Sequence, residues 1–159
     1  MSPGLNIEVI SLNQVPVNGS IPSESKQRPV VLVVDDEKVI ADTLSIILTK
    51  NGFSVMTAYS AEAALELTAV VAPDLLLSDV MMGPGLDGTQ LAIDVVEAFP
   101  GCKVLLFSGH AATRDLLDKV RDSGHNFTLL SKPLHPSDLL ARISESLQSI
   151  PSTRAGTVV

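Results

Sequence analysis

The sequence has few of the residues on which several common functions depend. Among its 159 residues there is one cysteine and no tryptophan, and only 3% are aromatic. A single cysteine excludes an intrachain disulfide and a cysteine-based zinc site. The shortage of aromatic residues and the formal charge of -7 argue against stacking on single-stranded nucleic acid or binding a phosphate backbone. We therefore expect no direct nucleic acid partner.

Membrane and secretion signals are also missing. No apolar run approaches the roughly 20 residues that cross a bilayer, and the N-terminus lacks the basic start and apolar core of a secretory signal. We therefore expect a cytoplasmic protein without a membrane partner. The hydrophobic content of 45% is enough for a core, and the length suits one domain.

The composition divides the chain into three parts. Residues 1–28 are rich in Ser, Pro, Asn and Gly and predict a disordered leader. Residues 29–150 carry the regular hydrophobic patterns and predict one compact domain. Residues 151–159 predict a flexible tail, which is too short for an additional DNA-binding domain.

Short apolar runs alternate with helical patterns through the compact domain. The runs that predict strands are 30–34, 53–57, 75–77, 104–107 and 127–130. The segments with apolar residues at helical spacing are 40–48, 61–68, 91–99, 116–120 and 139–150. Strands that are continuously apolar are buried on both faces, so this order predicts an α/β fold with a parallel sheet between layers of helices.

Polar residues follow four of these five strands at the carboxyl end. They are Asp35, Asp36, Asp79, Ser108 and Lys132. In an open α/β sheet the carboxyl ends of the strands border the ligand crevice, so we expect these side chains to gather at one edge. Each has a simpler interpretation by itself, such as a helix cap for the aspartates. Together, however, three crowded carboxylates need a cation to offset their repulsion.

The chemistry of this group suits phosphoryl transfer with a metal. Mg²⁺ prefers oxygen ligands, often one or two carboxylates together with phosphate oxygens and waters. A carboxylate beside such a metal can act as the nucleophile toward phosphorus. An ammonium such as that of Lys132 and a hydroxyl such as that of Ser108 can stabilise the charge on the transferred group.

Four motifs in this order closely resemble the receiver domains of bacterial two-component response regulators. They are "VLVVDDE", "LLLSDVMM" followed by "DG", "LLFSGH" and "SKPL". The resemblance covers about residues 29–150. It implies a flavodoxin-like, doubly wound sheet of five parallel strands in the order 2-1-3-4-5, flanked by five helices.

The resemblance also assigns a role to each residue of the group. Asp79 corresponds to the phosphoacceptor, and Asp35 and Asp36 to the acidic pair that binds Mg²⁺ or Mn²⁺ together with Asp79. The backbone carbonyl of Met81 corresponds to a further metal ligand. Ser108 corresponds to the switch hydroxyl and Lys132 to the lysine that contacts the phosphoryl group, with a cis peptide bond expected between Lys132 and Pro133.

The sequence departs from the common family pattern "DVMMPGMDG" in two places. Here the corresponding stretch is "DVMMGPGLDG", so Gly88 lies nine residues after Asp79 instead of eight, and Gly83 or Gly85 is the extra residue. Asp87 is then expected to cap the following helix. The aromatic switch position of the family, three residues before the lysine, is occupied by Leu129.

The resemblance implies a phosphorylation-dependent signalling domain that is not an enzyme in the usual sense, although it assists its own phosphorylation and dephosphorylation. A sensor histidine kinase or phosphotransfer protein would donate the phosphoryl group. The face formed by segments 116–120, 127–130 and 139–150 would change its affinity for a downstream protein or for a second copy of the chain.

Two other functions remain open at this point. A degenerate receiver would act as a constitutive protein-interaction module, and Leu129 at the switch position keeps this alternative in view. A phosphatase with an aspartate nucleophile would also use Mg²⁺ on an α/β sheet. It would need a second aspartate two residues after Asp79, where this sequence has Met81.

Overall fold

The computed structural model describes residues 28–158, apart from 86, 110–112 and 123. The predicted leader, residues 1–28, therefore lies outside the described residues except for its last position. Within the described part, no helix is both long enough and apolar enough to span a membrane.

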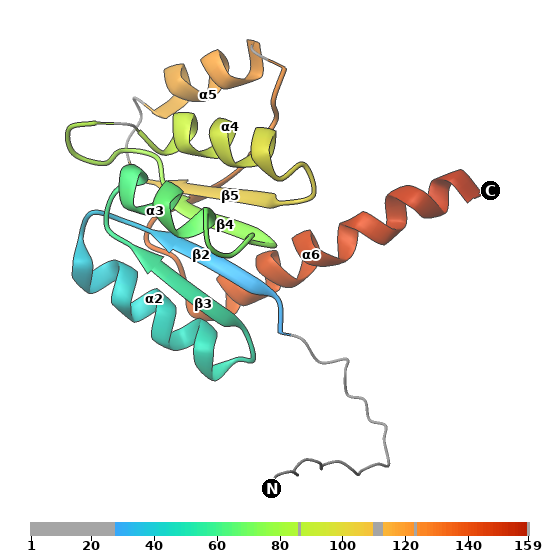
Figure 1. The fold of residues 1–159 in the computed structure, drawn as a ribbon, viewed down its shortest axis with the longest axis horizontal. Coiled ribbons are helices and arrows are strands. Elements are labelled where there is room, and N and C mark those ends of the chain that lie inside the picture. Colours follow the sequence, from blue (N-terminus) through green and yellow to red (C-terminus); the bar gives the residue numbers. More distant parts are fainter. Residues whose placement is uncertain (1–27, 86, 110–112, 123, 159) are drawn as a thin grey trace, which may run out of the picture.

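Strands and helices alternate along the described chain, as the sequence predicts (Figure 1). The strands are β2 (Val30–Val34), β3 (Ser54–Ala58), β4 (Leu75–Asp79), β5 (Lys103–Ser108) and β6 (Thr128–Ser131). The helices are α2 (Lys38–Lys50), α3 (Ala61–Thr68), α4 (Gly88–Ala98), α5 (Thr113–Asp122) and α6 (Pro136–Val158). Neighbouring strands are parallel, and their order across the sheet is β3-β2-β4-β5-β6. Counted from the first of these strands, this is the expected order 2-1-3-4-5.

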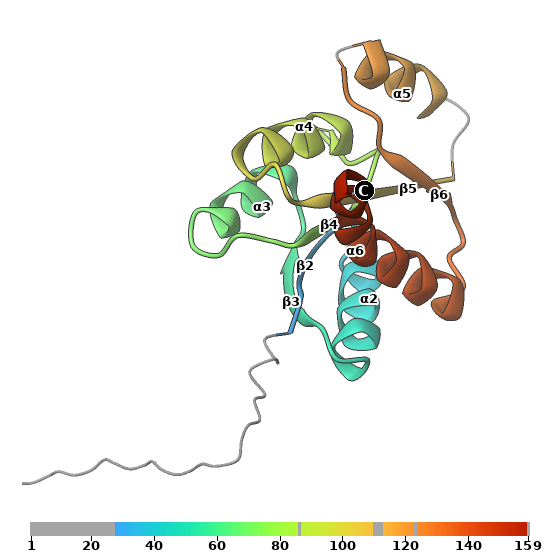
Figure 2. The same ribbon diagram turned by 90° about the vertical axis from the view of Figure 1, so that its right-hand side faces the viewer.

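Helices cover both faces of the sheet (Figure 2). On one face the core is formed with α2 and α6, and on the other with α3 and α4. Strand β2 shows why its apolar run is continuous. Val31 and Val33 pack into the first core, whereas Leu32 and Val34 pack into the second. Alternate side chains of a strand point to opposite faces, so both sets must be apolar when both faces are covered.

Local signals mark several of the helix boundaries. The Ser60 side chain accepts a hydrogen bond from the Ala63 backbone amide at 3.0 Å and caps α3. Asp87 caps α4 as predicted, accepting from the Gln90 backbone amide at 2.8 Å. Each cap satisfies an amide that the first turn of a helix leaves without an intrahelical partner.

The last helix is longer than the sequence pattern indicates. Its apolar spacing ends near Ile150, but α6 continues to Val158 and extends away from the sheet (Figure 1). The helical backbone thus includes most of the segment 151–159, for which flexibility stays a prediction.

The order of the strands places the functional edge. The chain passes from β2 to β3 on one side of β2 and then crosses to β4 on its other side. Loops after β2 and β4 therefore leave the sheet toward opposite faces, and a crevice opens between the carboxyl ends of these two neighbouring strands. Residues that follow β2 lie beside the last residues of β4.

Gly88 lies at the closest backbone approach beside this crevice. Its amide donates to the Val80 carbonyl at 2.9 Å, which holds the first turn of α4 against the end of β4. A Cβ atom at Gly88 would overlap the Asp79 carbonyl and lie 2.9 Å from the Cα of Val80. Both neighbours are backbone atoms, so neither can move aside without shifting the strand or the helix.

We expect Gly88→Ala to lower the free energy of unfolding by about 1–3 kcal/mol, because the added methyl overpacks a rigid contact. Urea denaturation would measure the change. Gly101→Ala is the matched control, since a Cβ there meets no atom within 4 Å. Equal stability of the two variants would contradict the assigned packing.

Candidate functional site

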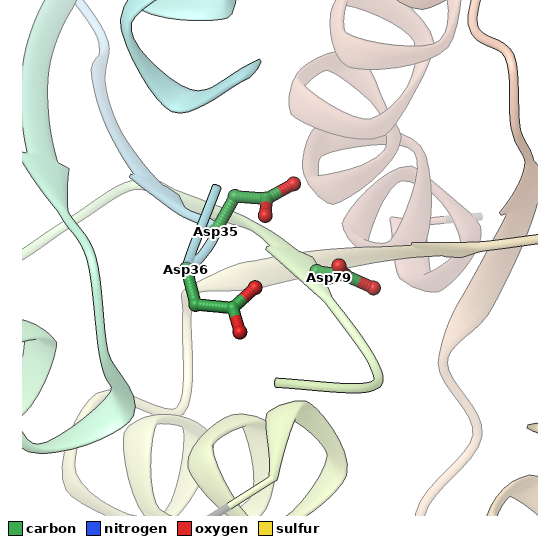
Figure 3. Close-up of side chains that lie close together, drawn as sticks. All are labelled: Asp35, Asp36 and Asp79. Atoms are coloured by element: carbon green, nitrogen blue, oxygen red, sulfur yellow. The ribbon is translucent and has the colours of Figure 1, made fainter. Parts of the chain in front are cut away.

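Three aspartates from two neighbouring strands meet at the crevice. Asp35 and Asp36 follow β2, and Asp79 is the last residue of β4 (Figure 3). One carboxylate oxygen from each lies within 4.8 Å of the others. Asp35 is fully buried and Asp79 is 5% exposed, whereas Asp36 is exposed. The parallel pairing of β2 with β4 brings these residues together, because Val34 is directly opposite Ser78.

Backbone amides hold the two buried carboxylates in place. The Glu37 amide donates to Asp35 Oδ1 at 2.9 Å, and the Met81 amide donates to Asp79 Oδ1 at 3.2 Å. Both donors lie in the segment that turns away from the strand carrying the carboxylate. One oxygen of each carboxylate is thus held by the backbone that immediately follows it in the chain.

Lys132 brings a positive charge to the same point from the far side of β5. Its Nζ lies 3.0 Å from Asp79 Oδ2 and 3.6 Å from Asp35 Oδ2. Burial lowers the pKa of Lys132, but the hydrogen bond and attraction to Asp79, with the charge of Asp35, outweigh it and raise the pKa. Lys132 is therefore an ammonium at neutral pH. The peptide bond between Lys132 and Pro133 is cis, as expected.

Asp35 is the least satisfied of the three carboxylates. Its Oδ2 is buried and has no hydrogen-bond partner, since Lys132 lies beyond hydrogen-bonding distance. Burial raises the pKa of Asp35, and the negative charges of Asp79 and Asp36 act in the same direction. A buried carboxylate oxygen without a donor is costly. A cation at this point would remove that cost.

The donor set fits a hard divalent cation. Three carboxylates against one ammonium leave an excess of negative charge within a few ångströms. Carboxylate and carbonyl oxygens are the ligands that Mg²⁺ and Mn²⁺ prefer. The Asp35 oxygen without a hydrogen bond and the excess of negative charge both favour such an ion.

Ser108 and its neighbours form the wall on the β5 side. Ser108 is the last residue of β5, is 6% exposed, and accepts a hydrogen bond through its carbonyl from the Lys132 amide at 3.2 Å. Gly109 leaves room beside Lys132, since a Cβ there would lie 3.7 Å from the Lys132 Cβ. All five predicted side chains thus come to one edge of the sheet, and Met81 lies in the turn directly after Asp79.

The turn between β4 and α4 makes a contact that the residue patterns do not predict. The Gly83 amide donates to Asp36 Oδ2 at 2.9 Å. Gly85 has a φ of 106° and lies close to Glu62 at the start of α3, where a Cβ would come within 2.7 Å of Glu62 Oε2. The extra residue is the one feature of the sequence that pointed to this turn. A residue count does not show which side chain a backbone amide contacts.

Leu129, at the family's switch position, is 40% exposed on β6. Phe127 precedes the strand, packs against the core under α3 and α4, and stacks on the His125 ring with a centroid distance of 5.6 Å. Phe127, the aromatic residue nearest to Leu129 in the sequence, therefore already stacks on another ring. Cys102, the single cysteine of the sequence, is buried, and this burial raises the pKa of its thiol to about 12.

Comparison with known proteins gives one consistent result. Residues 31–144 match the family model described as the response regulator receiver domain. The transcriptional regulatory protein GlrR of Escherichia coli is 32% identical over 124 residues, which make up 77% of this chain and 27% of that protein. The chain thus spans only 27% of the length of this curated relative.

Solved structures agree in fold. A CheY-like receiver domain protein from Methanospirillum hungatei is 28% identical with a TM-score of 0.70, covering 77% of this chain and 96% of its own. The signal receiver domain of an HD domain-containing protein from Pseudomonas fluorescens is 28% identical with a TM-score of 0.72. This second match covers 79% of the present chain and 99% of the solved one.

We expect Asp35→Asn to stabilise the metal-free protein at neutral pH. Because folding raises the pKa of Asp35 from 3.8, the folded state holds more protons than the unfolded state above that pH, and stability falls as the pH rises. The variant lacks this loss, so its advantage should grow from pH 3.8 toward neutrality. Urea denaturation with a chelator would measure it.

Asp118→Asn, an exposed position on α5, is the control for this comparison. A loss of stability in Asp35→Asn at neutral pH without metal would show that the buried carboxylate does not destabilise the folded state.

Proposed function

The chain belongs to the response regulator receiver domain family, and we propose from this that it is a phosphorylation-controlled signalling domain whose phosphoacceptor is Asp79. One observation carries the assignment. Asp79 ends the central strand β4 with its carboxylate 3.0 Å from the Lys132 ammonium and next to two further carboxylates. A nucleophile, a counter-charge for a phosphoryl group and a set of metal ligands thus lie in one small volume.

Asp35, Asp36, Asp79 and the backbone carbonyl of Met81 would hold Mg²⁺ or Mn²⁺. When bound, the ion supplies positive charge to the phosphoryl oxygens and offsets the repulsion between them and the carboxylates. This assignment is supported by the buried oxygen of Asp35 that lacks a hydrogen bond and by the oxygen-only donor set.

The residues of the chain then have distinct tasks in phosphoryl transfer. An oxygen of Asp79 forms a bond to phosphorus while the bond from phosphorus to a histidine nitrogen of the donor protein breaks. Lys132 exchanges its contact with the Asp79 carboxylate for one with a phosphoryl oxygen. Ser108 donates its hydroxyl proton in a hydrogen bond to another of these oxygens. No general base is needed, because a carboxylate carries no proton to remove.

A sensor histidine kinase or a phosphotransfer protein supplies the phosphoryl group in this proposal. Ser108 would move toward the new charge, and this movement would start the change between two conformations. The face formed by α5, β6 and α6 would carry that change to a downstream protein or to a second copy of the chain. With Leu129 at the switch position, Ser108 would act without the rotation of an aromatic side chain.

The rival functions fit less well. A phosphatase with an aspartate nucleophile needs a second carboxylate two residues after Asp79, and Met81 cannot transfer a proton. A degenerate receiver would not need the group of Asp35, Asp36, Asp79 and Lys132 that lies together here.

We expect the wild-type protein to be phosphorylated on Asp79 by acetyl phosphate when Mg²⁺ is present. A phosphate-affinity gel would show a second band that is lost with a chelator and lost in Asp79→Asn. Asp118→Asn should behave as the wild type, because that carboxylate lies on the exposed side of α5.

An unmodified wild-type protein under these conditions would exclude the phosphoacceptor and favour a constitutive interaction module. Continuous release of phosphate from small phosphoesters would instead favour the phosphatase.

A further inference from the structure

The turn after Asp79 contains a backbone donor that the common family pattern lacks. In "DVMMPGMDG" the fourth residue after the aspartate is proline, which has no amide hydrogen. In this chain the fourth residue is Gly83, and the proline follows as Pro84. When the two stretches are aligned on the methionines and the proline, Gly83 is the extra residue. Unlike the proline that follows the methionines in the family pattern, Gly83 has an amide hydrogen to donate.

This amide is directed at a proposed metal ligand. It donates to Asp36 Oδ2 at 2.9 Å, although 47 positions separate the two residues. Among the described residues, the Gly83 amide is the one hydrogen-bond donor to the Asp36 carboxylate. Asp35 and Asp79, by contrast, are fixed by burial and by amides from their own loops.

Asp36 therefore has the least support of the three carboxylates apart from this contact. It is exposed, and an exposed side chain that is fixed on metal binding loses rotamer freedom. A hydrogen bond from Gly83 to Oδ2 restricts the side chain beforehand and leaves Oδ1 available to a cation. Figure 3 shows the Asp36 carboxylate extending from the end of β2 toward Asp79.

The turn that presents the amide is itself held at other points. Gly85 adopts a left-handed backbone with a φ of 106° and lies against Glu62 of α3. Asp87 caps α4, and the Gly88 amide donates to Val80. These contacts fix Gly85, Asp87 and Gly88, which follow Gly83 in the turn.

We propose that Gly83 is a positioning residue that orients Asp36 for the divalent cation through its backbone amide. This inference rests on the metal site of the proposed function and adds the contact that holds its exposed carboxylate ligand. Partners that orient a metal ligand from outside the coordination sphere typically contribute about 10–100-fold to metal affinity.

Calorimetric titration with Mg²⁺ tests the role of the amide. Gly83→Pro removes the donor and should weaken Mg²⁺ binding about tenfold. Gly83→Ala is the matched control, because it keeps the amide and its Cβ would lie at an ordinary 3.5 Å from Asp36 Oδ2. The alanine variant should bind Mg²⁺ as the wild type does.

A double-mutant cycle separates positioning of Asp36 from distortion of the turn. With Mn²⁺ as the titrant for all four proteins, Gly83→Pro should weaken binding about tenfold in the wild type and cause no further loss in an Asp36→Ala background. A further tenfold loss there would show that proline acts through the Met81 carbonyl or another part of the turn, and would overturn the proposal.

Amide NMR spectra of the wild-type protein provide a test that does not depend on the proline variant folding. The Gly83 amide proton should resonate downfield, move upfield in Asp36→Ala, and stay downfield when Mg²⁺ saturates the wild type. An upfield shift on saturation, or tighter Mg²⁺ binding by Gly83→Pro, would mean that amide and cation compete for Asp36. Absence of any Mg²⁺ binding by the wild type would instead refute the proposed metal site itself.

Discussion

The pairing of Lys132 with the buried carboxylates is the interaction on which the site depends. Asp35 lies fully buried at the end of β2, and Asp79 is nearly so at the end of β4. Without the ammonium within 3.6 Å of both, two adjacent buried negative charges would oppose folding. The pairing is nevertheless incomplete, because Asp35 Oδ2 still lacks a hydrogen bond. This deficit is what favours a cation in the proposed function.

The scaffold and the site have different physical requirements. Strands β2, β4 and β5 are held by apolar packing on both faces, which is rigid and insensitive to charge. The loops that follow β2 and β4 are joined by polar contacts, such as the hydrogen bond from the Gly83 amide to Asp36. In the proposed function, a change of charge at Asp79 would move the loops while the sheet remains in place.

Residue patterns predicted much of the fold and of the candidate site. Continuous apolar runs such as Val30–Val34 predicted strands buried on both faces, and the alternation with helical spacing predicted the parallel sheet. The polar residues at the strand ends were expected at one edge, and Asp35, Asp79 and Lys132 do meet there. The length of α6 was missed, because its apolar spacing stops before the helix does.

The sequence by itself determined the fold class and which polar side chains gather at one edge of the sheet, since both follow from local periodicity and from the rule that parallel strands end at a common edge. Only the tertiary structure decided how the charges are shared. Strand register sets the distance from Lys132 to each carboxylate. Burial leaves one oxygen of Asp35 without a hydrogen bond. The contact from Gly83 to Asp36 joins two loops that lie far apart in the chain, and hydrogen-bond geometry across such a separation is set by packing and not by local pattern.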